Sequence, residues 1–287
     1  MPKCKSSPLR RRIGGLLEQA SLKLLLLNPN TTRSLTERMA ETAGAVLPAG
    51  VVLDTATAPR GFPYISNRSE ALVAGAVTLE MLAARPCTPS AAIVAAFGDP
   101  GIRAARDLFP FPVIGVAEAA MHSAAMLGDR FAIVAFTQRM RGWYQDCVEE
   151  VGLERRFAGF RAPAQSDERL GTVQTDLRDA LLECIEACHI HDGADVVITA
   201  GAPLAGFADI ARGATKPILI DPVVAAVHQA VAIAALRKPY ANGLGAWHDP
   251  KTSEGLDPAL ADQFAGKGSD RVADPPTLLR PGGRSGP

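Results

Sequence analysis

The sequence predicts an α/β protein made of two pseudo-symmetric lobes, each with a parallel β-sheet and helices packed around it. Three observations support this prediction: strand-like and helix-like segments alternate, one supersecondary unit recurs, and aromatic residues make up only 5% of the chain. The 287 residues, 47% of them hydrophobic, can bury one large core or two small ones. Helices on a parallel sheet suit this Ala-, Leu-, Val- and Gly-rich composition better than a β-sandwich does.

Continuous apolar runs mark the expected strands, because a strand covered on both faces has no polar side. The first run, Leu22 to Leu27, is broken by Asn28-Pro29-Asn30-Thr31-Thr32, and Asn30 is expected to cap the helix that follows. The other expected strands are Val51 to Thr55, Ala92 to Phe97, Pro112 to Gly115, Phe131 to Phe136, Asp195 to Ala200 and Pro217 to Ile220. The clearest expected helices are Ser69 to Ala84, Ala117 to Leu127, Gln174 to Cys188 and Pro222 to Leu236. This alternation predicts right-handed crossovers and parallel sheets.

A weak internal repeat divides the chain into two halves. Asn28 closes the first strand of one half and Ala96 ends its third, 68 residues later; Phe136 and Gly201 do the same in the other half, 65 residues apart. Ligands of open α/β sheets bind beyond the carboxyl ends of the strands. Two halves that face each other place four strand ends around one central cleft, where we expect the active site.

Four regions follow from this repeat and from composition. The first lobe is expected to comprise residues 22–115 plus 216–240, and the second lobe residues 116–215. Residues 1–21 are basic and weakly patterned, which indicates an N-terminal extension. After Trp247 the chain is rich in Pro, Gly, Asp and Lys, which is typical of a disordered or arm-like segment, so residues 241–287 are assigned to a C-terminal tail.

Charge and cysteine content limit the classes of partner. Because 30 basic residues balance 30 acidic ones, the surface has no electrostatic reason to bind nucleic acid or an anionic membrane. No stretch approaches the roughly 20 apolar residues that span a bilayer. Five cysteines without dense spacing indicate reduced thiols. Arg10-Arg11-Arg12 weakly resembles a twin-arginine export signal, but Glu18 and Lys23 interrupt its apolar region, so we expect a cytoplasmic location.

Five short segments resemble, in their order and spacing, those of one enzyme superfamily. They are Leu27 to Thr32 (LNPNTT), Gly61 to Ile65 (GFPYI) with Arg68, Phe97 to Gly101 (FGDPG), Pro112 to Ala120 (PVIGVAEAA) and Ala200 to Gly206 (AGAPLAG). Each alone is a weak motif, but together they extend over roughly residues 22–236. The chain resembles the aspartate/glutamate racemase superfamily, most closely its hydantoin and allantoin racemase branch.

The resemblance implies an active site between two α/β lobes, with no metal ion and no organic cofactor. In that family, two cysteines lie on opposite faces of the substrate: one thiolate removes the α-proton and the other thiol delivers a proton from the far side. Both family cysteines are replaced here, by Ala96 and Gly201, whose side chains cannot carry a proton. A decarboxylating relative retains only the second cysteine, and the chain departs from that pattern too.

The anion-binding frame that the resemblance implies is kept. It comprises Asn28, Asn30 and Thr31 after one strand, and the main-chain N–H groups of Phe97, Gly98, Gly201 and Ala202 after two others. Such N–H groups can stabilise the negative charge of an enolate. Other expected substrate contacts are Tyr64, placed to close the cleft, and Phe136 with Thr137, which mirror Asn28 to Thr31 in the second half.

Two residues are candidates for the missing acid/base chemistry, each with a structural alternative. Asp99 follows the Ala96 turn, but it also precedes a proline in the manner of a cap for the helix beginning at Pro100. His122 is a candidate because histidine is a common acid/base group in enzymes, although its place one turn into a helix also suits a packed or exposed side chain. Glu118 lies closer to that helix N-terminus, where a carboxylate is favoured for structural reasons.

The remaining cysteines predict neither a metal site nor a replacement thiol. Cys184 and Cys188 lie close to two histidines, but their helical spacing with Leu181 is typical of a buried helix face, and zinc sites usually show shorter spacing. Cys87 is expected near the opposite end of the strand that leads to Ala96. Cys147 is expected on a helix, where it does not look able to replace a family cysteine.

These observations favour a cofactor-independent enzyme that acts next to a carbonyl or carboxylate of a small molecule without the two family cysteines. An isomerase or racemase-like reaction is the first expectation, and a lyase (decarboxylase) or cyclase reaction the second. With small residues at positions 96 and 201, the cleft is expected to be roomy. The alternative is a non-catalytic homologue that binds a ligand or regulates a partner. By analogy with relatives, we expect a homo-oligomer.

Overall fold

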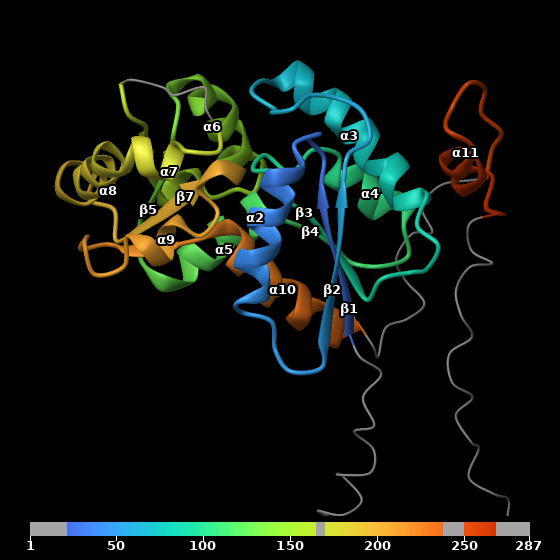
Figure 1. Cartoon of the computed structure of the whole chain (residues 1–287), viewed down its shortest axis with the longest axis horizontal. Helices are drawn as coiled ribbons and strands as arrows, with labels where there is room; N and C mark the ends of the chain where they lie inside the picture. Colours follow the sequence, from blue (N-terminus) through green and yellow to red (C-terminus); the bar gives the residue numbers. More distant parts are fainter. Residues whose placement is uncertain (1–21, 165–169, 238–249, 268–287) are drawn as a thin grey trace, which may run out of the picture.

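The chain folds into two lobes, each built on a four-stranded parallel sheet (Figure 1). The computed structural model describes residues 22–164, 170–237 and 250–267. The first sheet has the order β2-β1-β3-β4 and the second has the order β6-β5-β7-β8. The strands are β1 (Leu22–Asn28), β2 (Val51–Thr57), β3 (Ala91–Val94), β4 (Val113–Gly115), β5 (Phe131–Ala135), β6 (Phe157–Arg161), β7 (Val196–Ala200) and β8 (Ile218–Ile220). Because the two orders match position by position, the predicted two-lobed parallel α/β fold is confirmed.

The first lobe is organised around its central strands. The Leu24–Leu27 part of β1 is at most 2% exposed, since β2 and β3 flank it and helices cover both faces. The lobe's helices are α2 (Arg33–Gly44), α3 (Arg68–Ala83) and α4 (Ile102–Leu108). Helix α3 begins at a side-chain cap, where the Asn67 side chain accepts the N–H of Glu70 and the Glu70 carboxylate accepts the N–H of Ser66.

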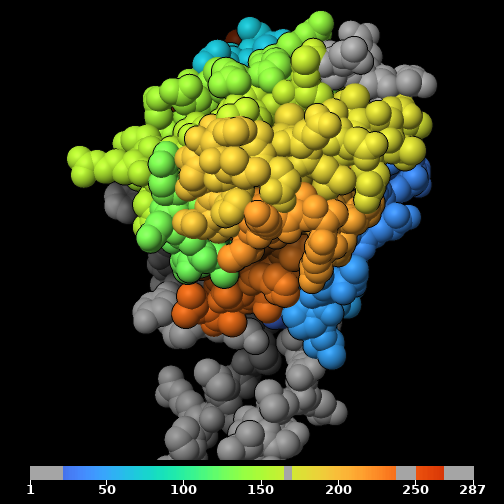
Figure 2. All heavy atoms as spheres, turned by 90° about the vertical axis from the view of Figure 1, so that its left-hand side faces the viewer, coloured from blue at the N-terminus to red at the C-terminus, as the bar shows by residue number. Residues whose placement is uncertain are grey.

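The second lobe repeats the plan with shorter connecting helices. These are η1 (Gln138–Met140), α6 (Arg141–Glu150), η2 (Glu154–Arg156), α7 (Val173–Asp176), α8 (Arg178–Asp192), η3 (Ala202–Leu204) and α9 (Phe207–Ile210). Viewed from the end of this lobe, α8 and the segments after β7 form much of the outer surface (Figure 2). Strands β5 and β7 are fully buried, which matches their continuous apolar sequences.

Two helices join the lobes. Helices α5 (Val116–Leu127) and α10 (Pro222–Arg237) contact each other, and α10 also contacts β1, β3 and β4 of the first sheet (Figure 1). The side-chain amide of Gln229 donates hydrogen bonds to the Ala119 carbonyl at 2.9 Å and to the Ser123 hydroxyl at 3.1 Å. One apolar cluster therefore runs from the first sheet through α5 and α10 into the second sheet.

Strand pairing differs from the expected division of the chain at one place. Strand β8 pairs with β7 in the second sheet, whereas residues 216–240 were all expected in the first lobe. Only the helix that follows, α10, lies against the first sheet. The edge strand β6 was not expected at all, because Phe157–Arg161 has no continuous apolar run and only Phe160 in it is buried.

Of the disordered or arm-like tail expected from the sequence, residues 250–267 are ordered and pack on the first lobe. This segment contains α11 (Pro258–Phe264), which begins at an Asp257 cap and packs against α3. Leu260 is 5% exposed within the apolar cluster of the first lobe, and the Gln263 amide donates to the Leu108 carbonyl at 3.1 Å. The N-terminal extension (1–21) and residues 241–249 and 268–287 of the tail lie outside the described residues.

Candidate active site

The polar side chains of the turn after β1 form hydrogen bonds within the turn and to helix α2. Asn28 is fully buried; its Oδ1 accepts the N–H of Asn30, and its Nδ2 donates to Asn30 Oδ1 at 3.1 Å and to Thr36 Oγ1 at 2.9 Å. The N–H of Thr31 donates to the Phe62 carbonyl at 2.9 Å. Asn30 does not cap α2, whose N-cap position is Thr32. These groups thus shape the loop and fix the segment that carries Tyr64.

Tyr64, Phe136 and Gly201 come together although they are far apart in the sequence. The Tyr64 and Phe136 rings lie 5.5 Å apart between centroids, and a Cβ on Gly201 would lie 3.3 Å from Phe136 Cε1. The Tyr64 hydroxyl is buried and has no hydrogen-bond partner among the described residues. Burial raises the pKa of this phenol, so it stays a neutral donor. The Phe136 ring also fills part of the space expected to be open beside Gly201.

The turn after β3 is covered by helix α6 of the other lobe. The Phe97 ring packs on Tyr144, with centroids 4.5 Å apart, and a Cβ on Gly98 would lie 2.2 Å from Trp143 Cζ2. Ala96 is only 8% exposed. Within the described residues, four main-chain N–H groups at these turns donate no hydrogen bond: those of Phe97, Gly98, Gly201 and Ala202. Both strand-end turns therefore carry free N–H donors, as the anion frame requires.

Polar contacts hold the two lobes together around these turns. The Arg68 guanidinium of α3 pairs with the Asp146 carboxylate of α6 at 2.5 Å. Arg38 of α2 donates to the carbonyls of Pro203 at 3.0 Å and Gly171 at 2.8 Å, both in the second lobe. Thr137 has a local role, since its Oγ1 accepts the N–H of Arg139 and caps η1.

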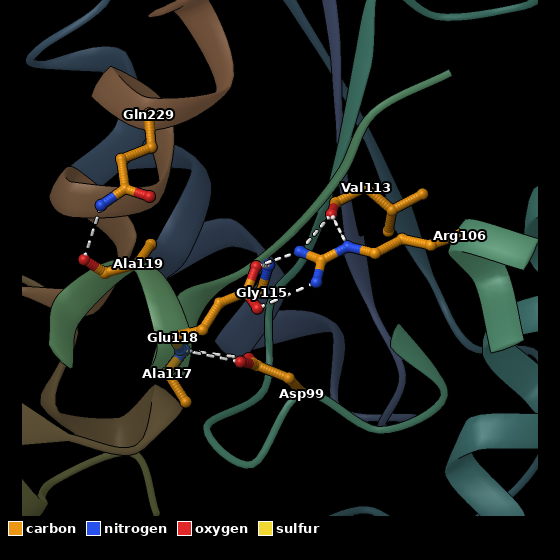
Figure 3. Close-up of polar contacts among 8 residues, drawn as sticks. All are labelled: Asp99, Arg106, Val113, Gly115, Ala117, Glu118, Ala119 and Gln229. Carbon is orange, nitrogen blue, oxygen red and sulfur yellow. Dashed lines mark hydrogen bonds and ion pairs between the residues drawn. The ribbon is translucent and has the colours of Figure 1, made fainter. Parts of the chain in front are cut away.

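Asp99 caps a helix, but a different helix from the one expected. Its carboxylate accepts the N–H groups of Ala117 at 2.9 Å and Glu118 at 2.8 Å, at the start of α5 (Figure 3). Helix α4, which follows in sequence, has no side-chain cap. Gly115 permits this approach, because a Cβ there would lie 2.1 Å from Asp99 Cγ. The backbone of Asp99 has a φ of +46°, a left-handed conformation that is rare outside glycine.

The protonation of Asp99 is balanced close to neutral pH. Burial raises its pKa to about 7, although the two N–H donors and Arg106 favour the carboxylate. The nearby Glu118 carboxylate forms an ion pair with the Arg106 guanidinium (Figure 3). The same guanidinium donates two hydrogen bonds to the Val113 carbonyl, at 2.8 and 2.9 Å. Glu118 therefore serves structure, as expected, whereas Asp99 is able to exchange a proton.

A cavity of about 220 Å³ opens beside Asp99. It is lined by Gly98, Asp99, Ile102, Arg103, Arg106, Glu118, Met121, His122, Cys147, Glu150 and Val151. Both acid/base candidates from the sequence, Asp99 and His122, thus face one space, with His122 at its exposed side. Cys147, 5% exposed on α6, lines the same space, which the sequence analysis did not foresee.

The Cys184–His191 segment is structural. Cys188 is fully buried in the second-lobe cluster, where burial raises its pKa to about 12, and Cys184 packs at the edge of that cluster. The His189 Nδ1 lies 2.9 Å from the Ala194 carbonyl. In the described ranges, no three His, Cys, Asp or Glu side chains gather as metal ligands would. Nor does any described helix have the length and hydrophobicity to span a bilayer.

Comparison with known proteins agrees with this architecture. The family model "Asp/Glu/Hydantoin racemase" matches residues 24–230. The chain belongs to this racemase family. The hydantoin racemase of Paenarthrobacter aurescens is 31% identical over 222 residues, which cover 75% of this chain and 92% of that protein.

Solved racemase structures show the same two-lobed arrangement. The allantoin racemase from Klebsiella pneumoniae superposes with a TM-score of 0.76 at 28% identity, covering 84% of this chain and 99% of that one. The allantoin racemase from Pseudomonas fluorescens gives a TM-score of 0.72 at 27% identity, covering 82% and 100%. The predicted membership and racemase-like enzyme class are confirmed, and the substrate of the family is a small molecule.

Sequence reasoning missed the part of this candidate site that comes from α6. Trp143 and Tyr144 cover the turn after β3, and Cys147 follows on the same buried side of the helix. Their helical spacing signals a buried face, but a single sequence does not show which turn they cover. The assignment of Ala96 and Gly201 to the family cysteine positions stays a prediction, as do the substrate contacts.

Proposed function

We propose that this enzyme moves a proton at the carbon next to a carbonyl group of a cyclic ureide of the hydantoin or allantoin type. Several relatives of this chain are named hydantoin racemase or allantoin racemase. Racemisation requires a base, an acid and fixed donors for the enolate charge. The free N–H groups of Phe97, Gly98, Gly201 and Ala202 supply the donors, and Asp99 and His122 are the acid/base candidates.

The Tyr64 hydroxyl is the observation that carries this proposal. A buried hydroxyl without a partner costs about 1–3 kcal/mol, so its presence between the lobes needs an explanation. A ureide carbonyl bound beside Phe136 and Gly201 would accept its hydrogen bond. The remaining polar candidates have an indirect role in this proposal, because they shape the loops of the site. They are Asn28, Asn30, Thr31 and Thr137.

The test follows a single enantiomer of a 5-substituted hydantoin, and of allantoin, in deuterated water. We expect the wild-type protein to exchange the α-proton above the enzyme-free rate by NMR, and to do so equally after dialysis against EDTA, because no metal ion or organic cofactor takes part. Binding of the probe without exchange would instead support the non-catalytic alternative.

Replacing Tyr64 by Phe separates ligand binding from stability. We expect Tyr64→Phe to leave the free energy of unfolding unchanged or raise it slightly, because a buried unpaired hydroxyl is removed. We expect the KM for the hydantoin to rise by about five- to tenfold, the cost of one hydrogen bond. A loss of stability with an unchanged KM would contradict the proposed role.

We also propose a cytoplasmic, homo-oligomeric enzyme. Cys87, Cys147, Cys184 and Cys188 are free thiols, as in a reducing compartment. A largely apolar groove along the edge strand β4 and α10, with Phe111, Val113, Ile114 and Ile233 in its lining, supports contact with a second copy. Light scattering of the purified protein is expected to give a mass at least twice that of one chain, and a monomer would refute this.

A further inference from the structure

Helix α2 of the first lobe reaches the turn that follows β7 in the second lobe. It lies at the boundary between the lobes and contacts η3 (Figure 1). The Arg38 guanidinium, half-buried on this helix, donates to the Pro203 carbonyl at 3.0 Å and to the Gly171 carbonyl at 2.8 Å. Arg38 has no acidic partner among the described residues, so these two carbonyls are the groups that it binds.

The rest of this turn is fixed from within the second lobe. The Gln174 side-chain amide donates to the same Pro203 carbonyl at 3.0 Å and to the Ala205 carbonyl at 2.7 Å. The buried Asp221 carboxylate accepts the N–H of Gly206 at 2.6 Å. Both lone pairs of the Pro203 carbonyl are therefore used, one by a donor from each lobe. In the part of the chain that the structure describes, the bond from α2 is the hydrogen bond that joins this turn to the first lobe.

The start of α2 is joined to the loop that carries Tyr64. The hydroxyl of Thr32, at the N-cap position of α2, donates to the Pro63 carbonyl at 2.6 Å, directly before Tyr64. The hydroxyl of Thr36, near the start of the helix, accepts the side-chain amide of the buried Asn28 at 2.9 Å, which fixes the same end to β1. One helix therefore connects the two sides of the proposed ureide site, the loop with the unpaired phenol hydroxyl and the turn after β7.

We propose that Arg38 is a positioning residue for the reaction, because it fixes the distance between the Tyr64 hydroxyl and the free N–H groups of the turn after β7. The inference rests on the proposed function and names a residue that this function does not yet assign. A hydantoin ring carries a carbonyl group on either side of one ring nitrogen. The distance between the lobes therefore decides whether donors from both can bind one ring at the same time. Arg38 itself acts through the Pro203 carbonyl and does not touch the substrate.

The donors of the two lobes contribute at different stages of the reaction. The Tyr64 hydroxyl can bind a carbonyl of the ureide before any proton has moved, so it contributes to binding in the ground state. The N–H groups of the turn matter most once the enolate oxygen carries a negative charge. A displacement of about 1 Å can cost about 10²-fold in rate. Loss of Arg38 should therefore lower kcat far more than it raises KM.

The experiment measures kcat and KM for exchange of the α-proton of a 5-substituted hydantoin in deuterated water. We expect Arg38→Ala to lower kcat by about 10²-fold, with KM within about threefold of wild type. Arg38→Lys should regain about a factor of ten, because an ammonium group can reach one carbonyl where the guanidinium binds two. A merely structural role would lower the folded fraction, measured by circular dichroism, and leave kcat per folded molecule unchanged.

Hydrogen–deuterium exchange of the turn, measured by mass spectrometry on the free protein, tests the positioning without any substrate. The N–H of Leu204 donates to the Gly201 carbonyl inside the turn at 2.9 Å. We expect the peptide that contains Leu204 to exchange faster in Arg38→Ala, because the adjacent Pro203 carbonyl has lost one of its donors. Exchange at the wild-type rate would show that the second lobe alone holds the turn, and would overturn the inference.

Arg33→Ala is the matched control, since Arg33 lies on the same helix but has a side chain that is 86% exposed and pairs with Glu37 of that helix. It should keep the wild-type kcat, KM and exchange of the turn. If Arg38→Ala keeps kcat within about twofold of Arg33→Ala, Arg38 does not position the site, while the proposed function stands. If the wild-type protein exchanges neither hydantoin nor allantoin, the proposed function fails, and this inference fails with it.

Discussion

Asp99→Ala is expected to lower the free energy of unfolding by about 2–4 kcal/mol. The change removes the cap of α5, worth about 1 kcal/mol, and leaves the N–H groups of Ala117 and Glu118 without their acceptors. Alanine also tolerates the φ of +46° poorly. Urea denaturation followed by circular dichroism measures the loss.

Two further variants define the cause of that loss. Asp99→Asn keeps one acceptor oxygen and tolerates a left-handed backbone, so its loss should be smaller. Asp107→Ala removes an exposed aspartate of α4 and should change stability by less than about 0.5 kcal/mol. Equal stability of Asp99→Ala and Asp107→Ala would show that Asp99 does not hold α5.

The same residue gives the stability of the protein a pH dependence. The Asp99 pKa is raised from 3.8 to about 7, so between these values the native protein holds a proton that the unfolded chain releases. Its contribution is therefore complete below pH 3.8 and is lost as the pH rises through 7. At about 1.4 kcal/mol per pKa unit, the upper bound is roughly 4 kcal/mol. The stability of wild type relative to Asp99→Asn should fall over this range, and a rise would contradict the direction of the shift.

The fold was predictable where the sequence carries a strong local signal. Strands β1, β5 and β7 lie at the centre of their sheets, so both faces must be apolar, and their sequences are continuous apolar runs. The edge strand β6 needs no continuous apolar run, and Gly159 within it makes its sequence still less typical of a strand. Helix α11 was missed because a Pro- and Gly-rich composition was taken for a tail, although Leu260 gives it an apolar anchor.

The site was predictable only in part, because its contacts cross from lobe to lobe. Gly201 and Phe136 lie side by side because they follow β7 and β5, which pair in the second sheet, and the repeat did not point to this contact. It did not show that Asn28 and Asn30 turn inward to bond each other. The proline after Asp99 pointed to α4, yet its side chain reaches α5, which follows the neighbouring strand β4. Such a choice depends on strand order, which a single sequence does not encode locally.

Gly98→Ala is expected to lower the free energy of unfolding by roughly 3–5 kcal/mol. The new Cβ would lie 2.2 Å from Trp143 Cζ2 and 2.6 Å from Cε2, so the indole or the turn must move. Overpacking of this kind costs about 1–3 kcal/mol. The φ of +107° adds a backbone cost of about 1–3 kcal/mol for any residue with a side chain.

Gly61→Ala isolates the backbone cost, because Gly61 has a similar φ of +115° but no atom within 4 Å of its Cβ position. A double-mutant cycle isolates the clash: in a Trp143→Leu background, Gly98→Ala should cost only about as much as Gly61→Ala. The coupling free energy between the two substitutions, about 1–3 kcal/mol, then measures the steric contact between helix α6 of one lobe and the turn after β3 of the other. If Gly98→Ala costs no more than Gly61→Ala, Trp143 does not lie on this turn.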